Sequence, residues 1–442
     1  MPGEGNIVLN IFKIPELRRR VLFTLVMLVI VRIGSYIPVP GIDAVALQRL
    51  FTQTGARGLL GFLDLFAGGA LSRFTLFALG IMPYISTSII LQLLTVVVPA
   101  LERLSKEGEA GRKKIQQITR FGTVVICAIQ AYALTVFMKA QPEVIVNPGI
   151  QFTVSAVVAI TAGTIFLMWI GEQITERGIG NGISLIIFIG IVARIPVAFR
   201  QVYEHLKVGE INPIVLIASF GIFVAIIAFV IMEQQGQRRI PIQHAKKIIG
   251  RKVYTAQGTH LPLRINPSGV IPIIFASSVL LFPAQIAQSL GARVPALERL
   301  AALLSPGRAL YLSLYALLII FFTYFYTQIQ LNPIDIADNL KKVGGYIPGI
   351  RPGENTSTYL QKVLNRIVLP GSIFLALIAL IPTIIQRWLN LPPEMAYLMG
   401  GTSLLIMVGV DLDTMKQIES HLLMRHYDGF MKKGGRIRGR SI

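Results

Sequence analysis

Long apolar stretches alternate with polar segments along the whole 442-residue chain. The stretches cover residues 21–38, 74–99, 121–138, 153–171, 183–199, 214–232, 269–290, 309–330, 367–386 and 394–410. Most could cross a hydrocarbon core of about 30 Å as a helix that rises about 1.5 Å per residue. The pattern therefore predicts ten membrane-spanning helices, with both ends of the chain on one side. A membrane β-barrel is excluded, because its strands alternate in segments of about ten residues.

The basic residues between the stretches predict the orientation of the chain. Of the 42 Lys and Arg residues, 30 lie in the N-terminal tail and in the segments that follow the even-numbered stretches. The positive-inside rule makes that side cytoplasmic, so we expect both termini in the cytoplasm. The composition agrees with a membrane protein, because 53% of the residues are hydrophobic and only 14% are charged.

The topology suggests two halves with five spans each, residues 1–205 and 206–442. An odd number of spans per half requires the halves to be inverted relative to each other. Large cytoplasmic loops are expected near residues 233–268 and 331–366, and residues after 410 form a cytoplasmic tail. The external connection contains the short apolar run GLLGFLDLFA at residues 58–67. It is too short to cross a bilayer, so it is either a re-entrant helix buried in protein or a helix on the outer surface.

Few residues in the chain suggest catalytic or metal chemistry. There is no G-x-x-x-x-G-K-[ST] phosphate loop, the single cysteine Cys127 excludes an intrachain disulfide, and the five histidines lack metal-ligand spacing. No catalytic set stands at a consistent depth in the spans. We therefore expect no cofactor, no metal and no enzymatic activity.

Charged side chains are nearly absent from the predicted spans, which argues against a proton- or sodium-coupled transporter. Arg32 and Arg194 lie in the outer parts of the first and fifth spans, and we expect both to extend to the outer interface. Glu172 lies at the cytoplasmic end of the fourth span and is expected to stay in water.

Two further patterns in the spans each allow two interpretations. Hydroxyl and amide side chains gather in the second and seventh spans, where they either support ordinary helix packing or form a seam that can open. Isoleucines recur one turn apart at Ile81 and Ile85 and at Ile183 and Ile187. They either face lipid or form an apolar constriction that excludes water and ions.

Five runs of sequence resemble one family. They are GGALSRFTLFALGIMPYISTSIILQLL (68–94), MWIGEQITERGIGNGIS (168–184), THLPLRINPSGVIPIIFASS (259–278), NPIDIADNLKKVGGYIPGIRPGENT (332–356) and GGTSLLI (400–406). In this order and with ten spans they resemble the SecY family, the channel subunits of the bacterial Sec translocon. The resemblance covers nearly the whole chain.

The resemblance implies an all-α polytopic membrane protein of the bacterial cytoplasmic membrane, with ten helices in two inverted halves and a short re-entrant plug near residues 58–71. Its implied function is to pass unfolded secretory polypeptides across the membrane and to release transmembrane segments sideways into lipid. The implied pore ring consists of Ile81, Ile85, Ile183, Ile187, Ile274 and Ile406. The implied plug residues are Gly58, Leu59, Leu60, Phe62, Leu63, Leu65, Phe66, Gly68 and Gly69. The implied lateral gate contains Ser86, Thr87, Gln92, Ser277, Ser278 and Phe282.

The resemblance also implies partners for the basic cytoplasmic loops: the ribosome, through its RNA, and the motor ATPase SecA. The docking residues would be Arg238, Arg239, Lys246, Lys247, Arg251, Lys252, Lys341, Lys342 and Arg351. Ordinary positive-inside charge in contact with lipid headgroups explains part of this set equally well. The further implied partners are the small subunits SecE and SecG, signal sequences, nascent polypeptides and membrane lipids. The alternative function, a secondary transporter for a small solute, lacks the midplane charges that it would need.

Overall fold

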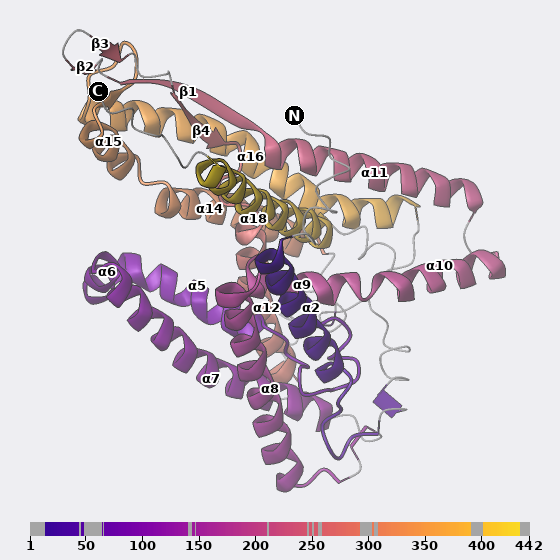
Figure 1. Ribbon diagram of the computed structural model, residues 1–442. Helices are drawn as coiled ribbons and strands as arrows, with labels where there is room; N and C mark the ends of the chain where they lie inside the picture. The colour runs from indigo at the N-terminus through magenta and orange to yellow at the C-terminus, as the bar shows by residue number, and fades with distance from the viewer. Residues whose placement is uncertain are drawn as a thin grey trace. The chain divides into compact units, whose positions relative to one another are not determined.

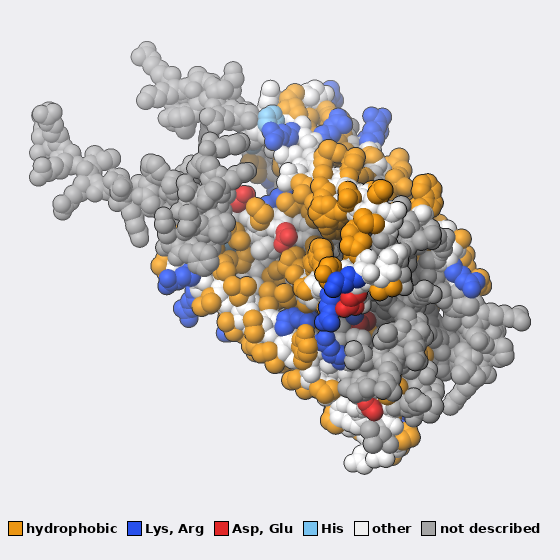
Figure 2. Space-filling model, turned by 90° about the vertical axis from the view of Figure 1, so that its right-hand side faces the viewer, with side chains coloured by type: hydrophobic (Ala, Val, Ile, Leu, Met, Phe, Trp, Pro, Cys, Tyr) orange, Lys and Arg blue, Asp and Glu red, His pale blue; other side chains and the backbone are white. Residues whose placement is uncertain are grey.

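The computed structural model of the chain describes residues 14–43, 46–47, 64, 66–139, 144–145, 147–209, 212–244, 247–249, 252–254, 259–291, 303–304, 308–389 and 401–433. Its contacts divide the chain into two compact units, Met1–Val197 with Ile406–Ile442, and Ala198–Leu405. Figure 1 traces the elements of both units. Exposed apolar side chains cover much of the face drawn in Figure 2, as expected for a protein whose outer surface meets lipid.

Six helices of the described part are long and apolar enough to cross a membrane, and a seventh span results if a sharply bent helix pair is counted as one. Each of the ten predicted stretches overlaps a helix, although some boundaries differ. The stretch 309–330 coincides with α14, Ala309–Gln330. The stretch 394–410 overlaps α18, Gly401–Lys433, and residues 394–400 of this stretch lie outside the described residues.

The first unit contains α2 (Pro15–Gly34), α5 (Met82–Val97), α6 (Pro99–Lys106), α7 (Glu109–Lys139), α8 (Ile150–Arg177), α9 (Gly182–Val192) and most of α18. Within it α7 packs against α5 and α8, and α2 packs against α8 and α9. The end of the chain belongs to this unit because α18 reaches the start of α9, where the Gly180 amide donates a 2.8 Å hydrogen bond to Gln417. The division into halves at residue 205, which places residues 206–442 together, stays a prediction.

The second span is helical only from Met82, whereas its apolar stretch begins at residue 74. Residues 74–81 form consecutive turns whose side chains are mostly buried against α7 and α8. The contact is close, because a Cβ on Gly163 of α8 would lie 2.0 Å from the Leu76 carbonyl oxygen. Irregular backbone at membrane depth is tolerated when protein covers it, as it is here. Helix α5 ends before Pro99, which holds Val98 extended, and α6 continues at 99°.

The second unit contains most of α10 (Ile195–Val208), α11 (Pro213–Gln235), α12 (Ile271–Gly291), α14, α15 (Pro333–Lys342) and α16 (Glu354–Leu389). Helix α14 packs between α12 and α16, and α11 contacts α16. Helix α16 has 36 residues and begins 13 positions before its apolar stretch, so its first turns belong to the polar end of the unit.

The polar end of the second unit contains strands that the apolar pattern did not predict. Strand β1 (Gln237–His244) pairs antiparallel with β4 (Thr259–Arg264) on one edge and with β5 (Gly345–Tyr346) on the other. Strands β2 (Lys247–Ile249) and β3 (Lys252–Tyr254) lie between β1 and β4 in the sequence and pair with each other. Ile240 and Leu263 pack on Leu360 and Leu364 of α16, which attaches the hairpin to the helix.

Candidate functional site

The segment from Asp64 to Leu71 is the described part of the implied plug. Of the nine plug residues, Phe66, Gly68 and Gly69 are described, and Gly58, Leu59, Leu60, Phe62, Leu63 and Leu65 lie outside the described residues. We call Asp64 and residues 66–71 the plug stem. Within it the Gly69 amide donates to the Asp64 carbonyl, and the Asp64 carboxylate accepts a 2.8 Å hydrogen bond from the Ser72 amide. These bonds close the stem into a compact turn.

Two arginines attach the plug stem to helices α2 and α9 of the same unit. Arg194, which follows α9, forms an ion pair with Asp64, whose side chain is only 3% exposed. Arg32 of α2 donates a 3.2 Å hydrogen bond to the Gly68 carbonyl. Both arginines therefore contact the plug stem, and their extension to the outer interface stays a prediction. The buried stem offers each arginine an acceptor: the Asp64 carboxylate for Arg194 and the Gly68 carbonyl for Arg32. The contact with Asp64 is favourable because a buried carboxylate is costly without a partner.

Backbone packing also holds the stem. Gly68 has φ +64°, a left-handed conformation that favours glycine, and a Cβ there would lie 2.7 Å from the Cα of Gly190 in α9. Two glycines thus bring the stem and α9 into direct backbone contact.

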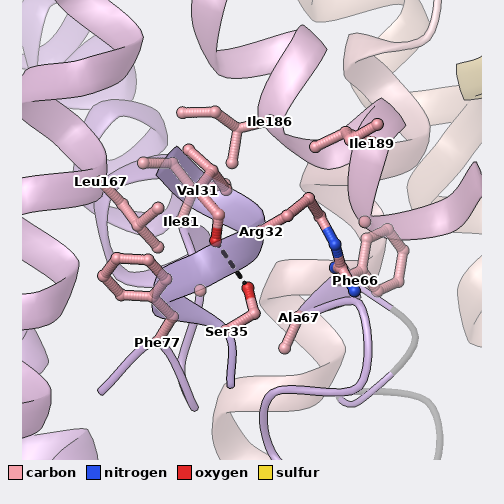
Figure 3. A pocket seen from close by; sticks show the side chains of 12 residues that line it. Val31, Arg32, Ser35, Phe66, Ala67, Phe77, Ile81, Leu167, Ile186 and Ile189 are labelled. Atoms are coloured by element: carbon pink, nitrogen blue, oxygen red, sulfur yellow. Dashed lines mark hydrogen bonds between the residues drawn. The ribbon is translucent and has the colours of Figure 1, made fainter. Parts of the chain in front are cut away.

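A small cavity lies beside the stem (Figure 3). It measures about 20 Å³, which is enough for one water molecule. Its walls include Val31 and Ser35 of the α2 end, Ile81, and Ile186 of α9. Figure 3 shows the Arg32 side chain running past this cavity, with its guanidinium beside the Phe66 ring. The stem, one candidate ring isoleucine and α9 therefore border the same space.

Ile85 and Ile187, two candidate ring residues of the first unit, lie about half the thickness of a hydrocarbon core from one end of their spans. A Cβ on Gly182 would lie 1.9 Å from the Gly171 carbonyl, so α9 begins beside Gly171, six residues before the end of α8. At about 1.5 Å per residue, Ile187 is then about 16 Å from the C-terminal end of α8. Ile85 stands 12 residues before the end of α5, about 18 Å from its bend. Both values are close to half of a hydrocarbon core of about 30 Å.

The other ring candidates differ in their surroundings. Ile81 is buried at the start of α5, and Ile406 is buried in α18. Ile183, in the first turn of α9, is half-buried against Gly171 of α8. In the second unit, Ile274 is buried in the first turn of α12.

The gate candidates on α5 face different directions. Ser86 and Gln92 are partly exposed, and Gln92 donates a weak 3.4 Å hydrogen bond to Ser88. Thr87 is buried, bonds the Pro83 carbonyl, and packs where a Cβ on Gly122 of α7 would lie 2.7 Å away. Because α7 already covers Thr87, we leave it out of the gate proposed below.

On α12 the gate candidates Ser277 and Ser278 are both buried. The Ser277 hydroxyl donates to the Ile274 carbonyl, and the Ser278 hydroxyl has no partner among the described residues. The backbone of Phe282 lies within α12, while its side chain is outside the described part.

Glu172 of α8 corrects an expectation, because it is 8% exposed and does not stay in water. Its carboxylate accepts a 2.9 Å hydrogen bond from Arg120 and a 3.1 Å hydrogen bond from Gln116, and Arg120 also contacts the second oxygen at 2.7 Å. Gln116 and Arg120 are one turn apart on α7, so they share one face of that helix. This spacing is the signal in the sequence that could have predicted their common contact with a carboxylate. The cluster joins α7 and α8 at the end where α9 begins.

The structure joins the two large polar loops of the second unit into one platform. Strand β1 of the first loop pairs with β5 of the second at Gln243↔Tyr346 and His244↔Gly345, and the Tyr346 hydroxyl donates to Gln243. The platform exposes five of the predicted docking residues: Arg238, Arg239, Lys341, Lys342 and Arg351. Lys246 and Arg251 lie outside the described residues, and for Lys247 and Lys252 only the backbone is described.

Arg351 occupies a fixed turn on this platform. It stands three residues before α16, and its carbonyl accepts a 2.9 Å hydrogen bond from the Thr356 hydroxyl. Its exposed side chain therefore projects from a rigid support.

Comparisons with known proteins agree with these elements and with the resemblance seen in the sequence. A family model described as SecY matches residues 75–415. The chain is 48% identical over 424 residues to the protein translocase subunit SecY of Escherichia coli K12, which covers 95% of this chain and 94% of that protein. A solved structure of a protein conducting channel shares the fold with a TM-score of 0.66 and 20% identity, covering 93% of this chain and 96% of that one.

A second solved structure was described for the plug domain of a SecY protein, which stabilises the closed state of the translocation channel and maintains a membrane seal. It has a TM-score of 0.64 and 21% identity over 93% of this chain and 96% of that one. The predicted fold class, a helical multi-pass membrane protein, is thereby confirmed. The chain belongs to the SecY family, the channel subunits of protein translocases.

Proposed function

We propose that this SecY-family channel is closed at rest by an isoleucine ring and an anchored plug, and that it opens both across the membrane and sideways into lipid. As a channel subunit it catalyses no covalent reaction. The observation that carries the proposal is the pair of arginine contacts to the plug stem, because they hold it beside Ile81 and α9.

The ring would consist of Ile81, Ile85, Ile183, Ile187, Ile274 and Ile406. Support comes from the positions of Ile85 and Ile187, which lie about 16–18 Å from one end of their spans, about half of a hydrocarbon core. A narrow apolar constriction excludes water and ions by dewetting, yet flexible side chains can move aside for a polypeptide. No charged group is then needed for closure.

The plug would lie against the ring from the outer side and move away when a polypeptide enters. The stem described above gives this movement a fixed base, since Gly68 touches the backbone of Gly190. The apolar run that precedes the stem, residues 58–63, would supply the part that covers the ring.

The lateral gate would lie between α5 and α12, with Ser86 and Gln92 on one side and Ser277, Ser278 and Phe282 on the other. Weak hydroxyl and amide contacts separate more readily than a packed apolar seam. An apolar segment of a passing polypeptide then gains about 25 cal/mol per Å² of surface when it leaves water for lipid. This gain drives the sideways release of transmembrane helices and signal sequences.

The polar platform would dock the partners that deliver polypeptides. Its arginines and lysines suit RNA phosphates of a ribosome, and Arg351 on its rigid turn suits the motor ATPase SecA. Lys246, Lys247, Arg251 and Lys252 would extend the same surface. SecE and SecG are the small subunits that the family implies. The charge distribution supports both termini in the cytoplasm of a bacterial cell, with the platform on that side.

The test is to trap a secretory polypeptide in transit and to map its neighbours by cysteine cross-linking. Cross-links are expected at Ile85→Cys for the translocating part and at Ser86→Cys for the signal sequence. A matched control is Ile129→Cys, on an exposed position of α7, which should not react. Cross-links that favour the control over Ile85→Cys would contradict the proposed path.

A further inference from the structure

An exposed tyrosine lies between two arginines at the end of α2. The Arg73 Cζ is 4.1 Å from the centre of the Tyr36 ring, and the Arg32 Cζ is 5.7 Å from it. Both distances are within the range of cation–π contacts. Tyr36 itself is 58% exposed.

Backbone contacts fix this arrangement. Helix α2 ends at Gly34, and the following residues run beside residues 73–76, with Pro38 bridged to Thr75. The Leu76 amide donates to the Ile37 carbonyl, and the Val39 amide donates to the Phe74 carbonyl. These contacts fix the backbone of Tyr36 beside that of Arg73 within the folded unit.

Positive charge is in excess at this place. Arg194 is neutralised by Asp64, whereas Arg32 donates to the uncharged Gly68 carbonyl and forms no ion pair with a described carboxylate. Among the described residues no carboxylate lies within 4.0 Å of Arg73. The Arg73 guanidinium beside the Tyr36 hydroxyl lowers the pKa of that phenol, and Arg32 adds to the shift.

An apolar stripe runs along α2 to the same cluster. Leu22, Leu25, Val29 and Ile33 follow one another at helical spacing, and all are exposed. The stripe from Leu22 to Ile33 covers 11 residue steps, about 17 Å, which is about half of a hydrocarbon core of about 30 Å. A helix α2 that crosses the membrane would place the cluster near the lipid headgroups. Tyrosine is also typical of that depth.

We propose that Arg73, Tyr36 and Arg32 bind the headgroup phosphate of an anionic phospholipid, whose acyl chain lies along the α2 stripe. Arginine is suited to this role because its planar guanidinium donates two parallel hydrogen bonds to phosphate oxygens. The uncompensated positive charge favours an anionic lipid over a zwitterionic one. The proposal rests on the proposed function only in that α2 crosses the membrane.

The test is native mass spectrometry of the full-length protein, titrated in detergent with phosphatidylglycerol or with phosphatidylcholine. We expect tighter binding of phosphatidylglycerol, and about a tenfold loss of that affinity in Arg73→Gln, which corresponds to one charge-assisted contact. Tyr36→Ala should weaken binding less. The matched control is Arg308→Gln, an exposed arginine at the start of α14 without a described aromatic contact, which should bind as the wild type does.

Three results would overturn the proposal: equal binding of the two lipids, wild-type affinity in Arg73→Gln, or complete competition by inorganic phosphate, which would indicate a free-anion site. The melting temperatures of the variants in lipid-free detergent identify any loss of folding, and Arg73→Lys offers a second variant that keeps the charge but loses the planar fork. Lipid binding is measured without translocation, so its failure would leave the channel mechanism untouched.

Discussion

The ion pair between Asp64 and Arg194 makes a quantitative prediction about channel closure. The change is Asp64→Asn, which keeps an oxygen for the Ser72 amide but removes the charge that Arg194 meets. The Asp64 side chain is 3% exposed and the Arg194 side chain 31%, so the pair is largely shielded from solvent. A hydrogen bond to a charged group contributes about 1.5–3 kcal/mol, and breaking a fully buried pair costs about 3–5 kcal/mol.

Because Arg194 keeps some access to water, we expect a loss of about 2–3 kcal/mol from the stem's attachment. At about 1.4 kcal/mol per factor of ten, the population with a displaced stem rises about 30- to 140-fold. The measurement is the ion conductance of the resting channel in a planar bilayer, where the open probability should rise by a comparable factor until it saturates.

Two variants make the test specific. Glu204→Gln breaks the exposed pair with Arg200 on α10 and should leave the closed baseline unchanged, because exposed pairs contribute little. The charge swap that combines Asp64→Arg with Arg194→Asp should restore only part of the closure, because an arginine at position 64 re-forms the ion pair but cannot accept the Ser72 hydrogen bond. An unchanged resting conductance in Asp64→Asn, in protein that is folded and inserted, would refute the anchoring role of this pair.

Three further outcomes are expected. Replacing Ile85 and Ile406 together by Asn should make the resting channel leak ions in a planar bilayer, because polar side chains wet the constriction; an unchanged baseline counts against the ring. Arg351→Glu should block motor-driven export while the protein still inserts and folds, and normal export measured with a secretory substrate would end the docking hypothesis. Glu172→Gln should destabilise the protein by about 2 kcal/mol and lower its Tm, since it leaves a half-buried arginine without its charge partner, whereas the exposed neighbour variant Glu176→Gln should melt like the wild type.

Several features of the protein follow from local properties of the sequence. The apolar stretches predicted the spanning helices because lipid requires both apolar side chains and internally paired backbone over a fixed length. The predicted and observed bounds agree closely where the whole apolar stretch is helical, as for α14. The family resemblance rested on long motifs, and it named ring, plug and gate candidates that hydropathy alone left undecided between lipid contact and a constriction.

Other features depended on residues far apart in the chain. The start of the second span is an example, since 74–81 is as apolar as a helix but is held in turns by contacts with α7 and α8. Hydropathy reports only how apolar a segment is, and tertiary packing decides its backbone. The strands β1 and β5 likewise unite two loops about a hundred residues apart into one platform.

The sequence by itself determined the class of protein, and it predicts ten spans and their orientation, because these depend on the transfer of apolar surface and charge between water and lipid. Only the tertiary structure decided the partners of the few buried charges. Asp64 with Arg194 and Glu172 with Arg120 are separated by 130 and 52 residues. A buried charge is stable only with a partner, and the fold decides which residue comes close enough to be that partner. The sequence around each residue therefore does not predict the pair.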